Sequence, residues 1–355
     1  MGTLKFCVAV CVLFAAEALA SKFTVSKHEL TVPLGKENSF VFSAETNSTT
    51  YYEVFFRADH PSLVQIIPEN VTVSSVQLTQ SITLKGLQLG RLKVNASIPN
   101  ADEKEYKDVF VNVTVERSSA LRIIAYVIGW IYFAAWSVSF YPQIYTNYKR
   151  KSVVGLNFDF LTLNVVGFFL YSLYNCGMFW IPEIERQYLE EHPQGLNPVK
   201  PNDVFFSLHA FVISLFTIFQ CLIYDRGEQK VSTIARIIHG IFTCFVLGCA
   251  IIAVLHYITW HRFLEYCSYV KLTITLIKYV PQAFYNYKRQ STVGWSIGNI
   301  FLDFIGGTLS MLQMIFDGIN YDDFGSIFGD LTKFGLGFFS VAFDVLFLVQ
   351  HYVLY

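Results

Sequence analysis

The sequence predicts a mixed fold, in which a lumenal all-β sandwich-like domain precedes a seven-helix transmembrane α bundle. Two triple-helix repeats and one linker helix (3+1+3) are expected to form the bundle. The chain is 53% hydrophobic and only 15% charged, which is typical of a protein with several membrane spans. Residues 142–167 align without a gap with residues 281–306, which indicates two copies of one structural unit. Residues 22–118 alternate with a period of two, which favours strands.

Residues 1–20 have the pattern of a secretory signal peptide. Lys5 precedes an apolar run, and the run is followed by the small-residue cleavage site Ala18-Leu19-Ala20. The run is too short to span a bilayer. The segment therefore predicts a cleaved signal, with a retained signal anchor as the alternative.

Residues 21–118 are predicted to form a glycosylated lumenal β domain. Turn residues separate short segments that are rich in β-branched and aromatic residues, as in a small sandwich. These segments are Phe23–Val25, Ser39–Phe42, Tyr51–Phe56, Leu63–Ile67, Ser81–Leu84, Arg91–Ile98 and Val109–Val115. Four acceptor triplets for N-glycosylation begin at Asn47, Asn70, Asn95 and Asn112. One such triplet is weak support, but four in one domain behind a signal peptide indicate a glycoprotein.

Seven apolar runs after Leu121 are long enough to cross a bilayer. They cover approximately residues 121–143, 157–180, 203–224, 234–257, 263–286, 295–317 and 332–354. The first, second, fifth and sixth contain the duplicated segments. We therefore expect a first triple-helix bundle at 119–225, a linker helix at 226–262 and a second bundle at 263–355.

The loops that connect these runs differ in charge on the two sides of the membrane. The basic loops carry Lys149, Arg150, Lys151, Arg226, Lys230, Arg236, Lys288 and Arg289. The acidic loops carry Glu183, Glu185, Glu190, Glu191, Asp203, Asp317, Asp322, Asp323 and Asp330. The positive-inside rule places the basic loops and the carboxyl terminus in the cytosol. The signal peptide independently places the amino-terminal domain on the other side.

Each copy of the repeat contains a Pro-Gln dipeptide. Proline removes a helical hydrogen bond and clashes with the preceding turn. Pro142 and Pro281 therefore predict matched kinks or hinges in the first and fifth helices. Gln143 and Gln282 are expected to bind the backbone carbonyls that the prolines free. Parallel repeats in a membrane protein favour a transporter whose site lies between them.

Ionisable side chains inside a predicted span are costly and are therefore candidate functional residues. Asp303 lies in the middle of the sixth span and aligns with Asn164 in the first repeat, so only one copy keeps a titratable group. A carboxylate can bind a proton on an acidic side of the membrane and release it on the other. Asp303 is the predicted proton carrier, and a permanent salt bridge to a lysine is the alternative. His209 and His239 are rival carriers.

The paired Pro-Gln motifs on seven predicted spans resemble the PQ-loop transporter family, over about residues 121–355. Ser291–Asp303, Asn202–Ala210 and residues 328–337 resemble the members that export cystine from lysosomes together with protons. The resemblance implies a multi-pass lysosomal membrane protein that transports L-cystine. Protons would be the coupling ion, with no other cofactor and no metal. Lysosome-surface nutrient-signalling and sorting-adaptor proteins are implied as partners. By the resemblance, a short cytosolic tail with a tyrosine-based sorting signal would follow Tyr355, and a second sorting signal would correspond to Tyr279–Ala283.

Cystine is a double zwitterion, so the site that the resemblance implies needs cations for the carboxylates and acceptors for the ammonium groups. Lys271 and Lys278 lie two turns apart on one face of the fifth helix and are predicted to bind carboxylates. Snorkelling of Lys271 to the interface is the alternative. Asp303 and Asp344 are predicted to bind ammonium groups, and Asn299, one turn before Asp303, either end.

Trp136 and Phe140, four residues apart on the first helix, are predicted to wall the substrate path, with simple packing as the alternative. The predicted function is a proton-coupled symporter that works by alternating access. A seven-helix lumenal cargo or nutrient receptor is one rival. The other is an uncoupled facilitator of a small neutral solute, which would need side chains that form hydrogen bonds with the hydroxyl groups of the solute. No enzyme is predicted, because the sequence shows no nucleophile–base or metal pattern.

Overall fold

The computed structural model describes residues 23–354, except for residues 45–50, 75–78, 100, 107, 155, 193–195, 291–296, 326 and 328–329. The signal segment and Asn47 therefore lie outside the described residues. The chain divides into two compact units, Met1–Ser118 and Ser119–Tyr355.

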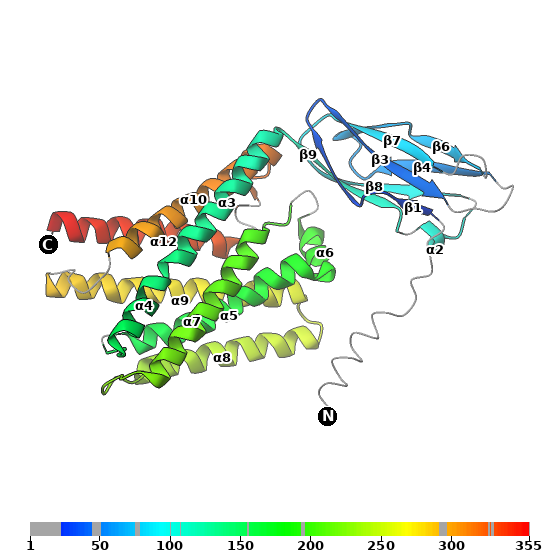
Figure 1. The fold of residues 1–355 in the computed structure, drawn as a ribbon. Coiled ribbons are helices and arrows are strands. Elements are labelled where there is room, and N and C mark those ends of the chain that lie inside the picture. Colours follow the sequence, from blue (N-terminus) through cyan, green and yellow to red (C-terminus); the bar gives the residue numbers. More distant parts are fainter. Residues whose placement is uncertain are drawn as a thin grey trace. The chain divides into compact units, whose positions relative to one another are not determined.

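The first unit is a two-layer β sandwich, as predicted (Figure 1). Its strands are β1 Phe23–Val25, β2 Glu29–Pro33, β3 Glu37–Ala44, β4 Tyr52–Ala58, β5 Val64–Ile67, β6 Asn70–Val73, β7 Thr79–Gly86, β8 Gly90–Ser97 and β9 Phe110–Glu116, with the short helix α2 Glu103–Tyr106. One sheet has the order β1-β3-β7-β5 and the other β2-β9-β8-β4-β6. Alternate residues point inward, so that Phe23, Phe40, Phe42 and Phe56 pack between the sheets.

Two strands of the sandwich were not predicted, and both are edge strands. β2 ends in Pro33, which cannot donate to a ladder and suits an edge position. β6 coincides with the polar acceptor triplet that begins at Asn70. Asn70 and Asn95 are exposed, whereas Asn112 is half-buried and its amide donates to Glu29 Oε1 at 2.8 Å. Glycosylation itself stays a prediction.

The second unit is a helical bundle (Figure 1). Its helices are α3 Ser119–Ser139, α4 Tyr141–Arg150, α5 Phe158–Trp180, α6 Pro182–Glu191, α7 Pro201–Ile223, α8 Thr233–Val254, α9 Trp260–Arg289, α10 Ile297–Tyr321 and α12 Leu331–Val349, which continues as the π-helical turn Gln350–Leu354. Among the described residues, six helical segments are long and apolar enough to cross a membrane, namely Ser119–Arg150, Phe158–Trp180, Pro201–Ile223, Thr233–Val254, Gly298–Tyr321 and Leu331–Leu354. The fifth predicted run corresponds to helix α9, which has 30 residues but is not among these six segments because it carries more charge.

The two Pro-Gln segments differ in backbone structure. The first span is interrupted at Phe140, between α3 and α4. Pro142 lies in the first turn of α4, where the backbone N–H that proline lacks would have no helical partner, so its absence costs nothing. Helix α9 instead continues through Pro281. The side chains of Pro281, Gln282 and Lys278 lie outside the described residues.

A helix between the second and third spans was not predicted. The acidic segment after α5 forms α6, which begins with Pro182 and has Glu183 and Glu185 in its first turn, where the helix dipole favours carboxylates. Ile184 and Tyr188 are its buried residues.

Each repeat contributes a bundle of three spans: α3/α4, α5 and α7 in the first, and α9, α10 and α12 in the second. The strongest packing between the bundles is that of α10 along α3 and of α5 along α9. The second span of each repeat therefore packs on the first span of the other. We call the end of the unit where α3, α7, α9 and α12 begin the outer end, and the opposite end the inner end.

Candidate functional site

Asp303 lies on α10 and is held by two hydroxyl groups from neighbouring helices of its own bundle. Tyr279 on α9 donates its hydroxyl to Asp303 Oδ2 at 2.8 Å. Ser340 on α12 donates to Oδ1 at 3.4 Å, and the two hydroxyl oxygens are 3.0 Å apart. Hydroxyl groups both donate and accept, so this triangle can hold the carboxyl group with or without a proton. No described lysine or arginine forms an ion pair with Asp303.

The first bundle contacts Asp303 through Trp136. The indole Nε1 of Trp136 donates to the backbone carbonyl of Asp303 at 3.2 Å, across the packed helices α3 and α10. The ring fits there because residue 306 is a glycine: a Cβ at Gly306 would lie 2.5 Å from Trp136. The predicted wall residue Trp136 is therefore part of the contact between the two repeats.

The close contact at Gly306 predicts that Gly306→Ala is destabilising. The added methyl group must displace Trp136, and overpacking of this kind costs about 1–3 kcal/mol. Gly240→Ala on α8 is the matched control, because nothing lies within 4 Å of the new Cβ. We expect the thermal unfolding temperature of the detergent-solubilised protein to fall for Gly306→Ala only. Equal unfolding temperatures for both variants would contradict this account of the contact.

Lys271 and Asn164 meet across the other interface between the repeats. Lys271 Nζ on α9 donates to Asn164 Oδ1 on α5 at 3.3 Å, and it lies 3.5 Å from the centroid of the Phe168 ring. Lys271 is only 1% exposed, so it does not snorkel to an interface. Its stem passes Gly167, where a Cβ would lie 2.9 Å from Lys271 Cδ. Gly167 aligns with Gly306, so each repeat uses the same glycine to admit a side chain from the other.

Aromatic rings connect the surroundings of Asp303 and Lys271. The ring of Trp136 lies 5.0 Å from that of Phe206, which lies 5.9 Å from that of Phe168. Along α9, Lys271 is eight residues before Tyr279, which corresponds to roughly 12 Å of helix axis. The site therefore has a cationic group at one interface between the repeats and a carboxyl group at the other.

The other predicted site residues have different surroundings. Phe140 packs on Phe168, with ring centroids 5.8 Å apart. Asn299 is half-buried on α10, and Asp344 on α12 is buried. Gln143 donates to Asn147 Oδ1 at 2.9 Å rather than to a carbonyl freed by Pro142.

A buried ion pair near the outer end was not predicted. Lys333 Nζ on α12 lies 2.8 Å from Asp203 Oδ2 on α7, and the two residues are 3% and 2% exposed. Tyr132 also donates its hydroxyl to Asp203, and Lys333 donates to Gln313 Oε1 at 3.0 Å. Asp203 was expected in an acidic loop. This prediction was wrong, because Asp203 lies in the first turn of α7 and is buried. The rule that selected Asp303, an ionisable group inside a span, also applies to Lys333.

Asp330 was expected in the same acidic loops and is also buried. Its Oδ1 accepts the backbone N–H of Lys333 at 2.8 Å and so caps α12, whereas Oδ2 has no hydrogen-bond partner among the described residues. Burial is the main cause that raises the pKa of Asp330 to about 7, and nearby Asp203 adds to it.

This pKa predicts that Asp330 makes the folded protein more stable in acid. The folded state binds the proton more tightly than the unfolded chain, whose carboxyl pKa is about 4. The contribution is therefore complete below about pH 4 and is lost as the pH rises through about 7, with a total of up to about 4 kcal/mol. The Asp330→Asn side chain can still accept the backbone N–H of Lys333 and so cap α12, but it cannot bind a proton in this pH range. We expect its unfolding temperature to change less than that of the unaltered chain between pH 5 and pH 8, and an equal change would contradict the assignment.

The inner ends of the two bundles carry the same amide clamp. Asn147 donates to Gln220 Oε1 at 2.9 Å in the first bundle, and Asn286 donates to Gln350 Oε1 at 3.1 Å in the second. In both, the glutamine donates at 3.1 Å to the carbonyl three residues before the asparagine. All four residues are buried. Each Pro-Gln segment is thus bound to the third span of its own bundle.

Comparison with known proteins places these features in a family. The model of the PQ loop repeat matches residues 124–184 and 263–323, which cover the first two spans of each bundle. Cystinosin from Drosophila melanogaster is 52% identical over 339 residues, which cover 95% of this chain and 85% of the relative. Cystinosin from Bos taurus is 46% identical and covers 86% and 82% of the two chains. A cystine transporter from Saccharomyces cerevisiae is 29% identical and covers 64% and 92%.

Proposed function

Because the chain belongs to the cystinosin family, we propose that it is a secondary transporter that carries L-cystine together with protons from the lysosomal lumen to the cytosol. The name of the yeast relative supports the substrate. The observation that carries the coupling is the position of Asp303. Its carboxyl group has two hydroxyl partners, and its backbone bonds to the other repeat.

The substrate would bind where the two repeats meet. Lys271 offers a cation for a carboxylate, and Asp303 offers an acceptor for an ammonium group. Lys271 and Tyr279, the partner of Asp303, are about two turns apart on α9, so the two charged groups can bind different ends of a ligand that has a zwitterion at each end. Asn164 and Phe168 contact Lys271, and Trp136 contacts Asp303. Lys278 and Asp344 stay proposed as further ligands. This distribution of opposite charges favours an amino acid over a neutral solute.

Proton coupling would follow from the chemistry of the Asp303 carboxyl group. When it is protonated, Asp303 can donate to Ser340 Oγ and accept from Tyr279. When it is ionised, it accepts from both. The site would load cystine and a proton when it opens to the acidic lumen and release both in the cytosol. Each unit of pH difference contributes about 1.4 kcal/mol per proton.

Alternating access would arise from movement of one triple-helix bundle against the other. The amide clamps bind each Pro-Gln segment to the third span of its bundle. We propose that Pro142, at the break between α3 and α4, is a hinge, and that Pro281 has the same role in α9 with Gln143 and Gln282 beside them. By the charge of the loops, the outer end is proposed to face the lumen.

A counterflow experiment separates this function from the lumenal receptor and from the neutral-solute facilitator. Proteoliposomes are loaded with unlabelled cystine and placed in labelled cystine at the same pH on both sides. A cystine transporter exchanges the pools, so the label rises transiently far above the amount of protein present. A receptor binds label only in proportion to the protein, and a facilitator of neutral solutes takes up labelled glucose instead. Either result would contradict the proposal.

A further inference from the structure

An open cavity of about 360 Å³ lies at the outer end, between the two repeats. Its walls come from α3, from the start of α7 and from the end of α10. It is separate from the surroundings of Asp303 and Lys271 described above. Groups of both charge signs line it: Arg122 and Lys200 are basic, and Asp317 is acidic. Such a volume and lining suit a small zwitterionic molecule.

The lining of this cavity contains an ion pair between the repeats. Lys200 Nζ at the start of α7 lies 3.6 Å from Asp317 Oδ2 on α10. The distance is longer than a hydrogen bond, and the two side chains are 29% and 18% exposed. Both side chains reach solvent, which weakens the attraction between them.

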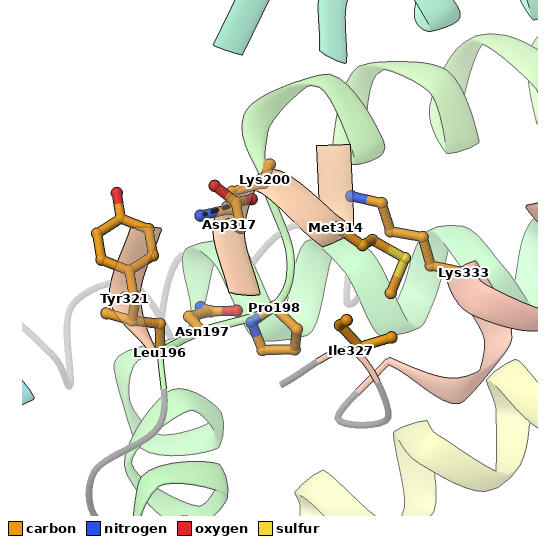
Figure 2. Close-up of a pocket in the computed structure, with 9 residues that line it drawn as sticks. All are labelled: Leu196, Asn197, Pro198, Lys200, Met314, Asp317, Tyr321, Ile327 and Lys333. Atoms are coloured by element: carbon orange, nitrogen blue, oxygen red, sulfur yellow. Dashed lines mark ion pairs between the residues drawn. The ribbon is translucent and has the colours of Figure 1, made fainter. Parts of the chain in front are cut away.

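A constriction adjoins this pair. A second pocket shares Lys200, Asp317 and Tyr321 with the cavity and extends to Met314 and Lys333 (Figure 2). Its volume is only about 20 Å³, which is room for about one water molecule. An amino acid in the outer cavity could therefore not enter this small pocket unless the Lys200–Asp317 pair separated.

Lys333, one partner of the buried Lys333–Asp203 pair, lines the constriction. The two pairs are connected, because the backbone N–H of Lys200 donates to Asp203 Oδ2 at 2.9 Å. The outer pair joins α7 to α10 and the inner pair joins α7 to α12. Both pairs therefore hold the first bundle against the second at the outer end.

We propose that the outer cavity is a first binding site for one zwitterionic end of an α-amino acid, and that the Lys200–Asp317 pair is the gate which this end opens. The ligand's ammonium group binds Asp317 and its carboxylate binds Lys200, so the ligand replaces each residue's partner. The pair then separates without leaving a charge unpaired. This inference rests on the proposed transport function for its substrate, but the gate itself does not.

The gate is tested by chemical access to the constriction, with no need for transport. Met314→Cys places a thiol in the small pocket, and the unaltered chain supplies the background from native cysteines. An impermeant maleimide is added at the outer face of the full-length protein in vesicles. We expect Asp317→Asn to raise the labelling rate of Met314→Cys about tenfold. The charge exchange Lys200→Asp with Asp317→Lys should keep it low. Equal rates in all three would overturn the gate.

The binding site is tested by the kinetics of cystine uptake through each face. We expect Asp317→Asn and Lys200→Gln to raise the KM for cystine offered at the outer face about tenfold, with a much smaller change in KM from the inner face and in kcat. Asp322→Asn is the matched control, because this neighbouring carboxylate is exposed and does not line the cavity. An unchanged outer KM in both variants would overturn the binding site. Should the unaltered chain fail to transport cystine, the proposed function and this substrate would fail together, while the labelling result would still decide the gate.

Discussion

Asp303→Asn is expected to abolish the accumulation of cystine driven by a pH gradient. The asparagine oxygen can still accept the hydroxyl of Tyr279, so the local hydrogen bonds are largely kept, but the side chain cannot carry a proton. With one proton per cystine, a difference of two pH units supports a concentration ratio of about one hundred. The ratio should fall to about one in the variant. The measurement is labelled cystine in proteoliposomes with an acidic exterior and a neutral interior.

Asp322→Asn is the control for this experiment. Asp322 is exposed and has a φ of 55°, a conformation that asparagine tolerates. The Asp322→Asn variant should accumulate cystine to the same ratio as the unaltered chain. Thermal unfolding of both variants would show that a loss at Asp303 is not a loss of folded protein. Full accumulation by a folded Asp303→Asn variant would contradict the assigned role.

Lys333→Met is expected to cause the largest loss of stability. Removal of one partner from a buried ion pair costs about 3–5 kcal/mol, because the other charge stays buried without compensation. Here the stranded group would be the Asp203 carboxylate, which is 2% exposed. The methionine fills most of the volume of the lysine stem. The loss of stability is therefore caused by the missing charge and not by a packing defect. The measurement is the unfolding temperature in detergent, together with the yield of monodisperse protein.

Two further variants make this prediction specific. Lys149→Met removes an exposed lysine from α4 and should be neutral. Lys333→Met combined with Asp203→Asn removes both charges and should recover part of the stability that the single variant loses. A double variant that is less stable than Lys333→Met would show that the ion pair is not the source of the effect.

The order and limits of the spans could be predicted because they depend on the length of apolar sequence. The predicted runs 157–180 and 203–224 correspond to α5 at Phe158–Trp180 and α7 at Pro201–Ile223. The sandwich could be predicted from its alternation, apart from β2 and β6. Helix α6 could not, because its ten residues lie in a polar loop without a long apolar stripe.

The site could be predicted only in part. The alignment of the repeats singled out Asp303 and Asn164, because an ionisable group in a span is conspicuous. Their partners depend on how helices from distant parts of the chain face one another, and a linear sequence does not contain that register. The contacts of Tyr279 and Ser340 with Asp303 were therefore not predicted, and neither was the contact of Lys271 with Asn164. Asp203 was assigned to a loop because it stands at the end of a span.

The two Pro-Gln segments show why a local rule has different outcomes. Pro142 begins a new helix, so its missing N–H is one that needs no partner. Pro281 lies inside a 30-residue helix that continues past it. A hinge role for both therefore stays a proposal, although the amide clamps next to them match closely.

The central claim is that protons enter with cystine, and it is tested most directly by measuring protons. A pH-sensitive dye is trapped in proteoliposomes with the same pH on both sides and the membrane voltage clamped at zero. Cystine is then added outside, and its labelled uptake is recorded in parallel. We predict that the interior becomes more acidic as cystine enters, and that Asp303→Asn abolishes the acidification. Entry of cystine at the normal rate without any change of internal pH would contradict the account.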